Sequence, residues 1–214
     1  MDFTISPVTK EVEINTNKIS SEFFSIKSKS PDPLYIKLYV KEIIDPKLET
    51  EKERELEGNS EIILNPSKLI VYPFETKRVR TFIQLGEKKS ESIYKIYFEQ
   101  VNDFEYYDNY PQSEPNGLMP VRYILSSLIK AIPTSSKAII SNQKGVISNS
   151  GSRHIRIVEK CVSAEKGNCN WEKISSYFHL YPMNEISWED DLLRNAQSIK
   201  YTIPPQHYEY TLSR

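Results

Sequence analysis

The sequence has little glycine and no long apolar stretch. Only 6 of its 214 residues are glycine, and none sits in a loop of the kind that cradles a nucleotide phosphate. No apolar run approaches the roughly 18 residues that a transmembrane helix needs. No apolar stretch follows Met1 either, as it would in a secretory signal peptide. We therefore expect no cofactor and no membrane insertion, while the missing leader fits either a cytoplasmic protein or a mature secreted chain.

An excess of positive charge is also missing. The chain has 28 basic and 29 acidic residues and a formal net charge of -1, whereas proteins that grip nucleic acid by its backbone are usually strongly basic. The three histidines, His154, His179 and His207, lack the spacing of metal ligands. We expect neither a nucleic-acid partner nor a metal.

Catalytic motifs are scarce as well. Ser127 and Lys130 have the Ser-x-x-Lys spacing of serine acyl enzymes. Such a pair shares one face of a helix, but in an extended segment its two side chains point to opposite faces. The carboxylates of Asp190 and Asp191 lie in polar surface context. We therefore predict that the protein is not an enzyme.

The two cysteines indicate a hairpin crosslink. Cys161 and Cys169 are separated by seven residues that include Gly167. A disulfide closing so short a loop contributes about 2–3 kcal/mol and implies an oxidising compartment. Free buried thiols are the alternative, because two cysteines without neighbouring ligands make a poor zinc site.

Most of the chain has the alternating polarity of β-strands, with abundant Tyr, Ile, Val and Thr. The strands are predicted at residues 3–8, 23–28, 34–43, 62–64, 69–72, 77–83, 92–101, 118–132, 138–140, 146–148, 154–158, 198–203 and 208–212. The charged segment 45–61 is expected to be a solvated loop, with a local helix as the alternative. A polar loop is expected at 102–117, and residues 133–136 look like a hinge. The pattern predicts an all-β protein with two β-sandwich domains, 1–132 and 133–214.

Six segments in a distinctive order carry a family resemblance. They are residues 3–7 (FTISP), 28–39 (SKSPDPLYIKLY), 64–73 (LNPSKLIVYP), 76–80 (TKRVR), 92–101 (SIYKIYFEQV) and 128–133 (LIKAIP). Together they resemble the periplasmic chaperones of the chaperone–usher pilus pathway, in particular the alternate class that serves colonisation-factor-type fimbriae. The resemblance covers the first domain well, and the second matches through its length and its cysteine pair.

The resemblance implies a fold and a function. The fold would be two immunoglobulin-like β-sandwiches joined at a hinge in an L or boomerang shape. The protein would be a periplasmic chaperone without a cofactor. It would bind pilin subunits by lending them a β-strand, a form of β-augmentation, and deliver them to the outer-membrane usher. Whether the free protein self-associates is left open.

By the same resemblance, the strand lent to the partner is residues 118–132. Lys130 corresponds to the basic residue that anchors the pilin's terminal carboxylate. Counting back by twos places Val121, Tyr123, Leu125 and Ile129 on one partner-binding face. The opposite face, with Ile124 and Leu128, is expected to pack in the protein's own core.

Two departures from the family pattern affect the site. The family's second anchor is an arginine in the first strand, but Asp2 or Phe3 stands there, so Arg80 and Arg122 are the candidates to replace it. Glu91 matches a carboxylate of the family's inter-domain charge network, whereas the arginine expected after Lys130 is missing. A minor pilin or an adhesive β-sandwich is the alternative function.

Overall fold

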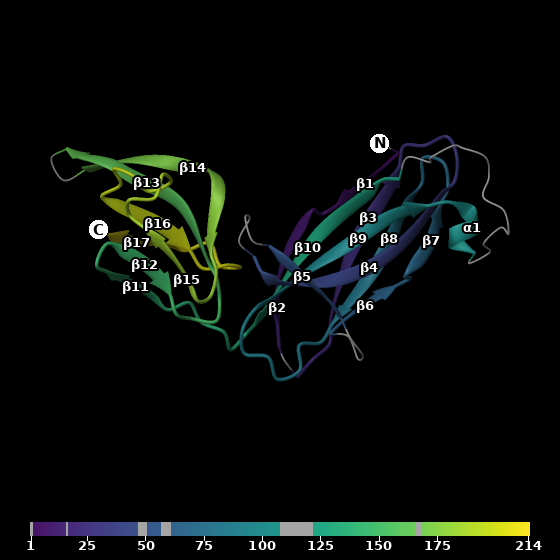
Figure 1. Cartoon of the computed structure of the whole chain (residues 1–214), viewed down its shortest axis with the longest axis horizontal. Helices are drawn as coiled ribbons and strands as arrows, with labels where there is room; N and C mark the ends of the chain where they lie inside the picture. The colour runs from purple at the N-terminus through teal and green to yellow at the C-terminus, as the bar shows by residue number, and fades with distance from the viewer. Residues whose placement is uncertain (1, 16, 47–50, 57–60, 108–121, 166–167) are drawn as a thin grey trace. The chain divides into compact units, whose positions relative to one another are not determined.

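The computed structural model describes residues 2–15, 17–46, 51–56, 61–107, 122–165 and 168–214 (Figure 1). The chain forms two compact units, residues 1–87 with 92–131 and residues 88–91 with 132–214. Nearly all of the described secondary structure is β-strand, and the short helix α1 (Asp103–Tyr106) has four residues. The described part of the chain holds no helix with the length and apolar character that crossing a bilayer requires.

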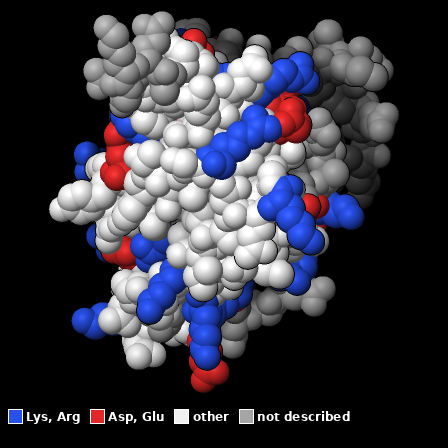
Figure 2. All heavy atoms as spheres, turned by 90° about the vertical axis from the view of Figure 1, so that its left-hand side faces the viewer, with Lys and Arg blue, Asp and Glu red and all other residues white. Residues whose placement is uncertain are grey.

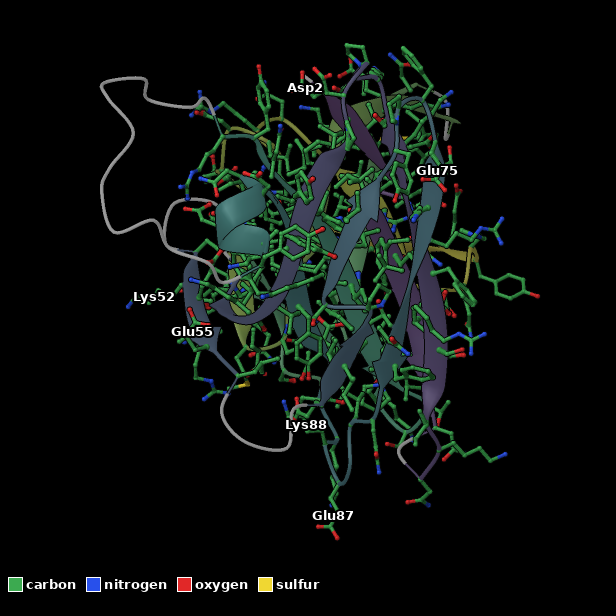
Figure 3. All side chains as sticks on the ribbon, turned by 90° about the vertical axis from the view of Figure 1, so that its right-hand side faces the viewer. Asp2, Lys52, Glu55, Glu75, Glu87 and Lys88 are labelled. Atoms are coloured by element: carbon green, nitrogen blue, oxygen red, sulfur yellow. A yellow bond between two sulfur atoms is a disulfide. The ribbon has the colours of Figure 1, made fainter. Side chains whose placement is uncertain are left out.

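The first unit is a sandwich of two sheets. One sheet has the order β1-β3-β8-β6, and the other has the order β2-β10-β9-β4-β5 with β7 also paired to β4. The first sheet contains β1 (Phe3–Ser6), β3 (Ser20–Ser28), β8 (Thr76–Ile83) and β6 (Ile62–Asn65). The second contains β2 (Thr9–Ile14), β10 (Ile124–Pro133), β9 (Ser92–Val101), β4 (Leu34–Asp45), β5 (Lys52–Glu55) and β7 (Lys68–Val71). In Figure 3, Asp2 and Glu75 mark one end of this sandwich and Glu87 the opposite end.

Period-two alternation explains why these segments form a sandwich. On β9, Tyr94, Ile96 and Phe98 are fully buried, while the residues between them face outward. Phe98 meets Phe24 of the other sheet with ring centroids 6.2 Å apart. Burying each such side chain contributes roughly 1.5–3 kcal/mol, so the register of β9 is set by its inward face.

The beginning of the chain serves both sheets. β1 pairs with β3 in one sheet, and β2 lies beside β10 in the other. Pro7 and Val8 connect the two strands. Proline has no N–H to give to a ladder, so the sequence itself interrupts the first strand where it changes sheets.

The second unit is also built from two sheets, with the orders β11-β12-β15 and β14-β13-β16-β17. The first contains β11 (Ile140–Gln143), β12 (Val146–Asn149) and β15 (Asn184–Ser187). The second contains β14 (Asn168–Leu180), β13 (Ile155–Glu165), β16 (Ser198–Thr202) and β17 (Glu209–Ser213). Its core gathers Ile147, Ile155, Ile157, Ile174, Leu180, Ile186, Trp188, Leu193, Ala196 and Ile199.

Two features fix the interior of the second unit. Trp188 is fully buried, and its indole Nε1 donates a hydrogen bond of 3.0 Å to Asn142 Oδ1. A disulfide joins Cys161 on β13 to Cys169 on β14, with Cα atoms 5.7 Å apart. The predicted disulfide is therefore confirmed, and the free-thiol alternative is wrong.

The structure confirms the all-β fold with two immunoglobulin-like sandwiches and corrects some local predictions. Part of the segment 45–61, expected to be a solvated loop, is the strand β5, and residues 47–50 and 57–60 lie outside the described residues. Helix α1 falls within the expected loop 102–117, of which residues 108–117 are not described. β2, β14 and β15 were not predicted from the sequence.

Candidate functional site

Strand β10 has different neighbours along its two edges. On one side it pairs antiparallel with β9 from Ile124 to Ala131. On the other side, contacts with the N-terminal segment begin only halfway along the strand. Ser127 Oγ donates to the Pro7 carbonyl at 2.8 Å, Leu128 N–H to the Val8 carbonyl at 2.9 Å, and Lys130 Nζ to Glu11 at 3.4 Å. These contacts advance in the same direction along both segments, so β2 covers only the second half of this edge.

The first half of that edge is open. Backbone groups in a strand alternate between the two neighbours. Leu128 N–H points to the β2 side, so the N–H and C=O groups of Ile124 and Ser126 point to the same side. The Tyr123 carbonyl, in contrast, accepts from Gln100 N–H at 2.9 Å, on the β9 side. Among the described residues no strand pairs with Ile124 or Ser126 on the β2 side. This stretch is a short template for one more strand.

The outward face beside this edge carries apolar side chains. Ile124 is 50% exposed, and Leu128 is half-buried. Their partners across the ladder are Glu99 and Lys95 of β9, which also face outward. Ser126 stands between them, opposite Tyr97.

The predicted faces of β10 are therefore reversed. Ile129 is fully buried, and Tyr123 and Leu125 are partly buried against the same core. Their cross-strand neighbours include the buried Phe98 and Tyr94. Ile129, a predicted partner contact, faces the protein's own core, and the predicted core residue Ile124 faces outward. The partner roles of Tyr123 and Leu125 stay predictions, and Val121 lies outside the described residues.

Lys130 lies in a charged pair. Its side chain is 4% exposed, and its Nζ is 3.4 Å from Oε1 of Glu11, whose side chain is 15% exposed. Two charges held this far from water need each other. The sequence analysis missed Glu11, although Val12 and Ile14 alternate with Glu11 and Glu13 as a half-buried strand would.

The other two predicted anchors do not adjoin Lys130 within the first unit. Arg80 is on β8 of the other sheet, where its guanidinium lies 4.8 Å from the centroid of the Phe23 ring. Arg122 is eight residues from Lys130, about 26 Å along an extended strand. It pairs with Glu105 and lies 3.9 Å from Glu99. Neither position supports a second anchor beside Lys130.

The second unit satisfies its charges near residue 133 without the family's missing arginine. Arg153 is buried and donates to the Pro133 carbonyl at 3.1 Å and to Ser136 Oγ at 3.0 Å. Glu91, predicted from the resemblance, is 3% exposed and lies 2.6 Å from Nδ1 of the fully buried His154. Arg153 had no signal in the sequence, because its acceptors are backbone and hydroxyl oxygens.

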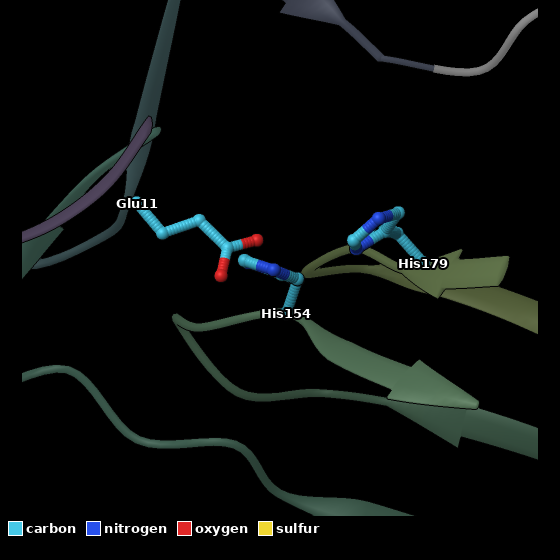
Figure 4. A group of neighbouring side chains, drawn as sticks. All are labelled: Glu11, His154 and His179. Atoms are coloured by element: carbon cyan, nitrogen blue, oxygen red, sulfur yellow. The ribbon is translucent and has the colours of Figure 1, made fainter. Parts of the chain in front are cut away.

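A second histidine lies beside His154. The ring of His179, on β14, has its centroid 5.1 Å from that of His154 (Figure 4). The ring of Tyr181 is 5.5 Å from His154. Strand pairing brings these residues together across 25 positions of sequence, so no local spacing could reveal the cluster.

The serine hydrolase alternative finds no support in the geometry. Ser127 Oγ donates to the Pro7 carbonyl, and Lys130 Nζ is bonded to Glu11. Three positions apart on a strand, the two side chains point to opposite faces, so Lys130 cannot deprotonate Ser127.

Two sandwiches, with one strand of the first bordered by β2 along only half of its length, are the architecture of fimbrial chaperones. The crystal structure of the class 5 fimbriae chaperone CfaA matches with a TM-score of 0.68 and 23% identity, covering 100% of this chain and 99% of that one. A chain from a chaperone–tip adhesin complex of CFA/I fimbriae biogenesis matches with a TM-score of 0.66 and 21% identity, covering 100% and 99%. A chain from the Salmonella enterica complex of SafA pilin with the SafB chaperone has a TM-score of 0.57 and 9% identity, covering 99% and 96%.

Curated relatives come from the same field of biology. The chain is 29% identical over 208 residues to a CS1 fimbrial protein of Escherichia coli, covering 92% of this chain and 83% of the relative. It is 27% identical over 157 residues to a CFA/I fimbrial protein of Escherichia coli, covering 69% and 60%. No protein-family model matches. The resemblance that the sequence segments indicated is confirmed: this protein has the fold of the pilus-assembly chaperones.

Proposed function

We propose that this protein is a periplasmic chaperone that binds pilin subunits by adding β10 to their sheet and delivers them to an outer-membrane usher. The observation that carries the proposal is the open edge at Ile124 and Ser126, with Ile124 and Leu128 on the outward face. A partner strand there gains main-chain hydrogen bonds, and the apolar side chains fill its groove. The disulfide supports an oxidising compartment such as the periplasm. The likeness to chaperones solved with a pilin or a tip adhesin supports this class of partner.

Lys130 is the proposed anchor for a carboxylate of the partner. Its ammonium lies on the β2 side of β10, where Glu11 now accepts from it. A partner carboxylate would share or replace this interaction. Charge-assisted hydrogen bonds of this kind are about twice as strong as neutral ones.

The test removes one backbone donor from the open edge. In Ser126→Pro the edge N–H is lost, while the hydrogen bonds to β9 remain, because those come from the flanking residues. Proline is tolerated at strand edges, and it confines Leu125 to an extended conformation that it already has. Ser126→Ala is the matched control, since it changes the side chain and keeps the N–H.

Each variant is co-expressed with a pilin from the same genome, and the complex is measured by size-exclusion chromatography. We expect the wild type and Ser126→Ala to form a one-to-one complex and Ser126→Pro to lose it while keeping its circular dichroism spectrum. A Ser126→Pro protein that binds as well as the control contradicts the edge assignment. If the purified chain polymerises with itself and binds no pilin, the alternative of a minor pilin or adhesive domain is correct.

A further inference from the structure

A cavity of about 400 Å³ in the second unit has a lining with unusual chemistry. It is bordered by two lysines, three serines, one glycine and one isoleucine: Lys89, Lys137, Ser135, Ser150, Ser152, Gly151 and Ile139. Among the described residues no acidic side chain lines it, although acidic residues outnumber basic ones in the whole sequence. The cavity is therefore a local concentration of positive charge and hydroxyl groups.

The floor of this cavity is rigid. Ser152 N–H donates to the Lys137 carbonyl at 2.7 Å, and Ser150 N–H donates to the Ile139 carbonyl at 2.9 Å. Gly151 fits between them only because it has no side chain, since an added Cβ would lie 2.3 Å from the Lys137 carbonyl oxygen. The donors around the cavity are thus fixed before any ligand arrives, which lowers the entropic cost of binding.

Several of these donors are not used within the protein. Among the described residues, neither Lys89 nor Lys137 forms an ion pair, and the hydroxyls of Ser135 and Ser150 form no hydrogen bond. Ser152 Oγ accepts the Lys137 N–H at 3.1 Å, which leaves its own proton to donate. Other lysines behave differently: Lys200, for example, lies 2.7 Å from Glu159. Figure 2 shows basic side chains spread over one face of the molecule, with acidic ones among them.

We propose that this cavity binds a tetrahedral oxyanion, a phosphate or a sulfate group. Two ammonium groups balance its charge, and three hydroxyls supply further donors, more than the two oxygens of a carboxylate use well. Ile139 is 55% exposed and offers an apolar contact for the group that carries the anion. This site is separate from β10 and does not depend on the proposed chaperone function.

The test is an amide NMR titration of the whole protein with sodium phosphate and with sodium sulfate, against sodium acetate and sodium chloride at equal ionic strength. We expect saturable shifts centred on residues 137 and 150–152 with phosphate or sulfate. The double variant Lys89→Ala/Lys137→Ala should weaken binding by roughly tenfold or more. Lys173→Ala, an exposed lysine elsewhere in the same unit, should leave it unchanged.

Further arms separate the sources of the anion and protect the result. Cosedimentation with phosphatidylglycerol vesicles, lost in the same double variant, identifies a lipid headgroup as the source, and shifts with phosphate alone identify a free anion. If the lysine variant does not fold, Ser135→Ala/Ser150→Ala takes its place, because these hydroxyls have no bonds within the described structure. Equal shifts with acetate or chloride, or shifts spread over all lysine-bearing surfaces, overturn the proposal.

Discussion

Single charged and polar side chains inside the first unit decide both its stability and its proposed chemistry. Lys130 is the clearest case, because a residue proposed to hold a partner's carboxylate already holds one of its own in Glu11. Removing one member of such a pair leaves a charge in poor contact with water. A loss of binding in a Lys130 variant is therefore informative only when the loss of stability has been measured as well.

We expect Lys130→Met to lower the free energy of unfolding by on the order of 3 kcal/mol, because Glu11 loses the ammonium beside it. Methionine keeps the length and packing of the lysine stem. The double variant Lys130→Met/Glu11→Gln should recover most of the loss. Urea unfolding followed by circular dichroism measures this. If the double variant is as unstable as the single one, the two side chains are not coupled.

Thr81 should respond in the opposite sense. It is fully buried on β8, and its hydroxyl has no hydrogen-bond partner among the described residues. We expect Thr81→Val to raise the free energy of unfolding by about 1 kcal/mol, because it removes a buried unsatisfied group with little change in shape. Ser127→Ala is the comparison: Ser127 is equally buried but bonded to Pro7, so its variant should be less stable. Two variants that change stability in the same direction would contradict this account.

Among the elements, β5 is held to its sheet mainly by side-chain charges. Its described residues are all exposed or half-buried and none joins a hydrophobic core except Leu56, which follows it. Glu53 accepts from the Tyr97 hydroxyl, and its carboxylate lies 3.0 Å from Lys95 Nζ. In Figure 3, Lys52 and Glu55 mark this strand at the border of the sandwich. Charge–charge contacts replace the apolar contacts that hold the other strands.

This attachment should be sensitive to acid. Burial alone would raise the pKa of Glu53, but hydrogen bonds from Tyr97 and Lys95 outweigh it and lower that pKa below 4.5. Conversely, burial and the bond to Glu53 raise the pKa of Tyr97 to about 12. A carboxyl with a lowered folded pKa stabilises the fold above its unfolded pKa, and this contribution is lost as the pH falls through the folded value.

We therefore expect Glu53→Gln to lose less stability than the wild type between pH 7 and about pH 3.5. Glu87→Gln, an exposed glutamate of the same unit, should follow the wild type. Urea midpoints at the two pH values measure the difference. Parallel curves for the wild type and Glu53→Gln would show that β5 is held in another way.

Elements with a clean alternation were predictable from the sequence, and those held by other forces were not. Residues 92–101 form β9 as predicted, because their inward side chains are large and apolar. β5 reads as a charged loop, because its strand is held by ion pairs. On β10 both faces carry apolar residues, so polarity could not say which face turns inward. The answer depends on the ladder with β9, which places Leu125 opposite the buried Phe98.

At the scale of the molecule, the two units give separate signals. Both tryptophans, Trp171 and Trp188, belong to the second unit, so tryptophan fluorescence follows that unit alone. The disulfide lies there too, and Trp171 is the ladder partner of Cys161. The crosslink can therefore be tested without disturbing the strand proposed to bind a partner.

Reducing the disulfide should lower the stability of the second unit by about 2–3 kcal/mol, since it releases a short loop in the unfolded chain. Urea unfolding with and without a phosphine reductant, followed by tryptophan fluorescence, measures the change. Cys161→Ala/Cys169→Ala should match the reduced protein. A midpoint unaffected by both treatments would contradict a stabilising role for this crosslink.

The assignment of residues 88–91 to the second unit means that the backbone passes between the units three times. No single cut can therefore release either unit whole. A fragment starting at residue 133 would lack Glu91, and His154 would be buried without the carboxylate that lies 2.6 Å from it. Two genes, each encoding one sandwich, could not have been fused end to end to give this chain without exchanging that short piece, so the protein is inherited and folds as one indivisible module.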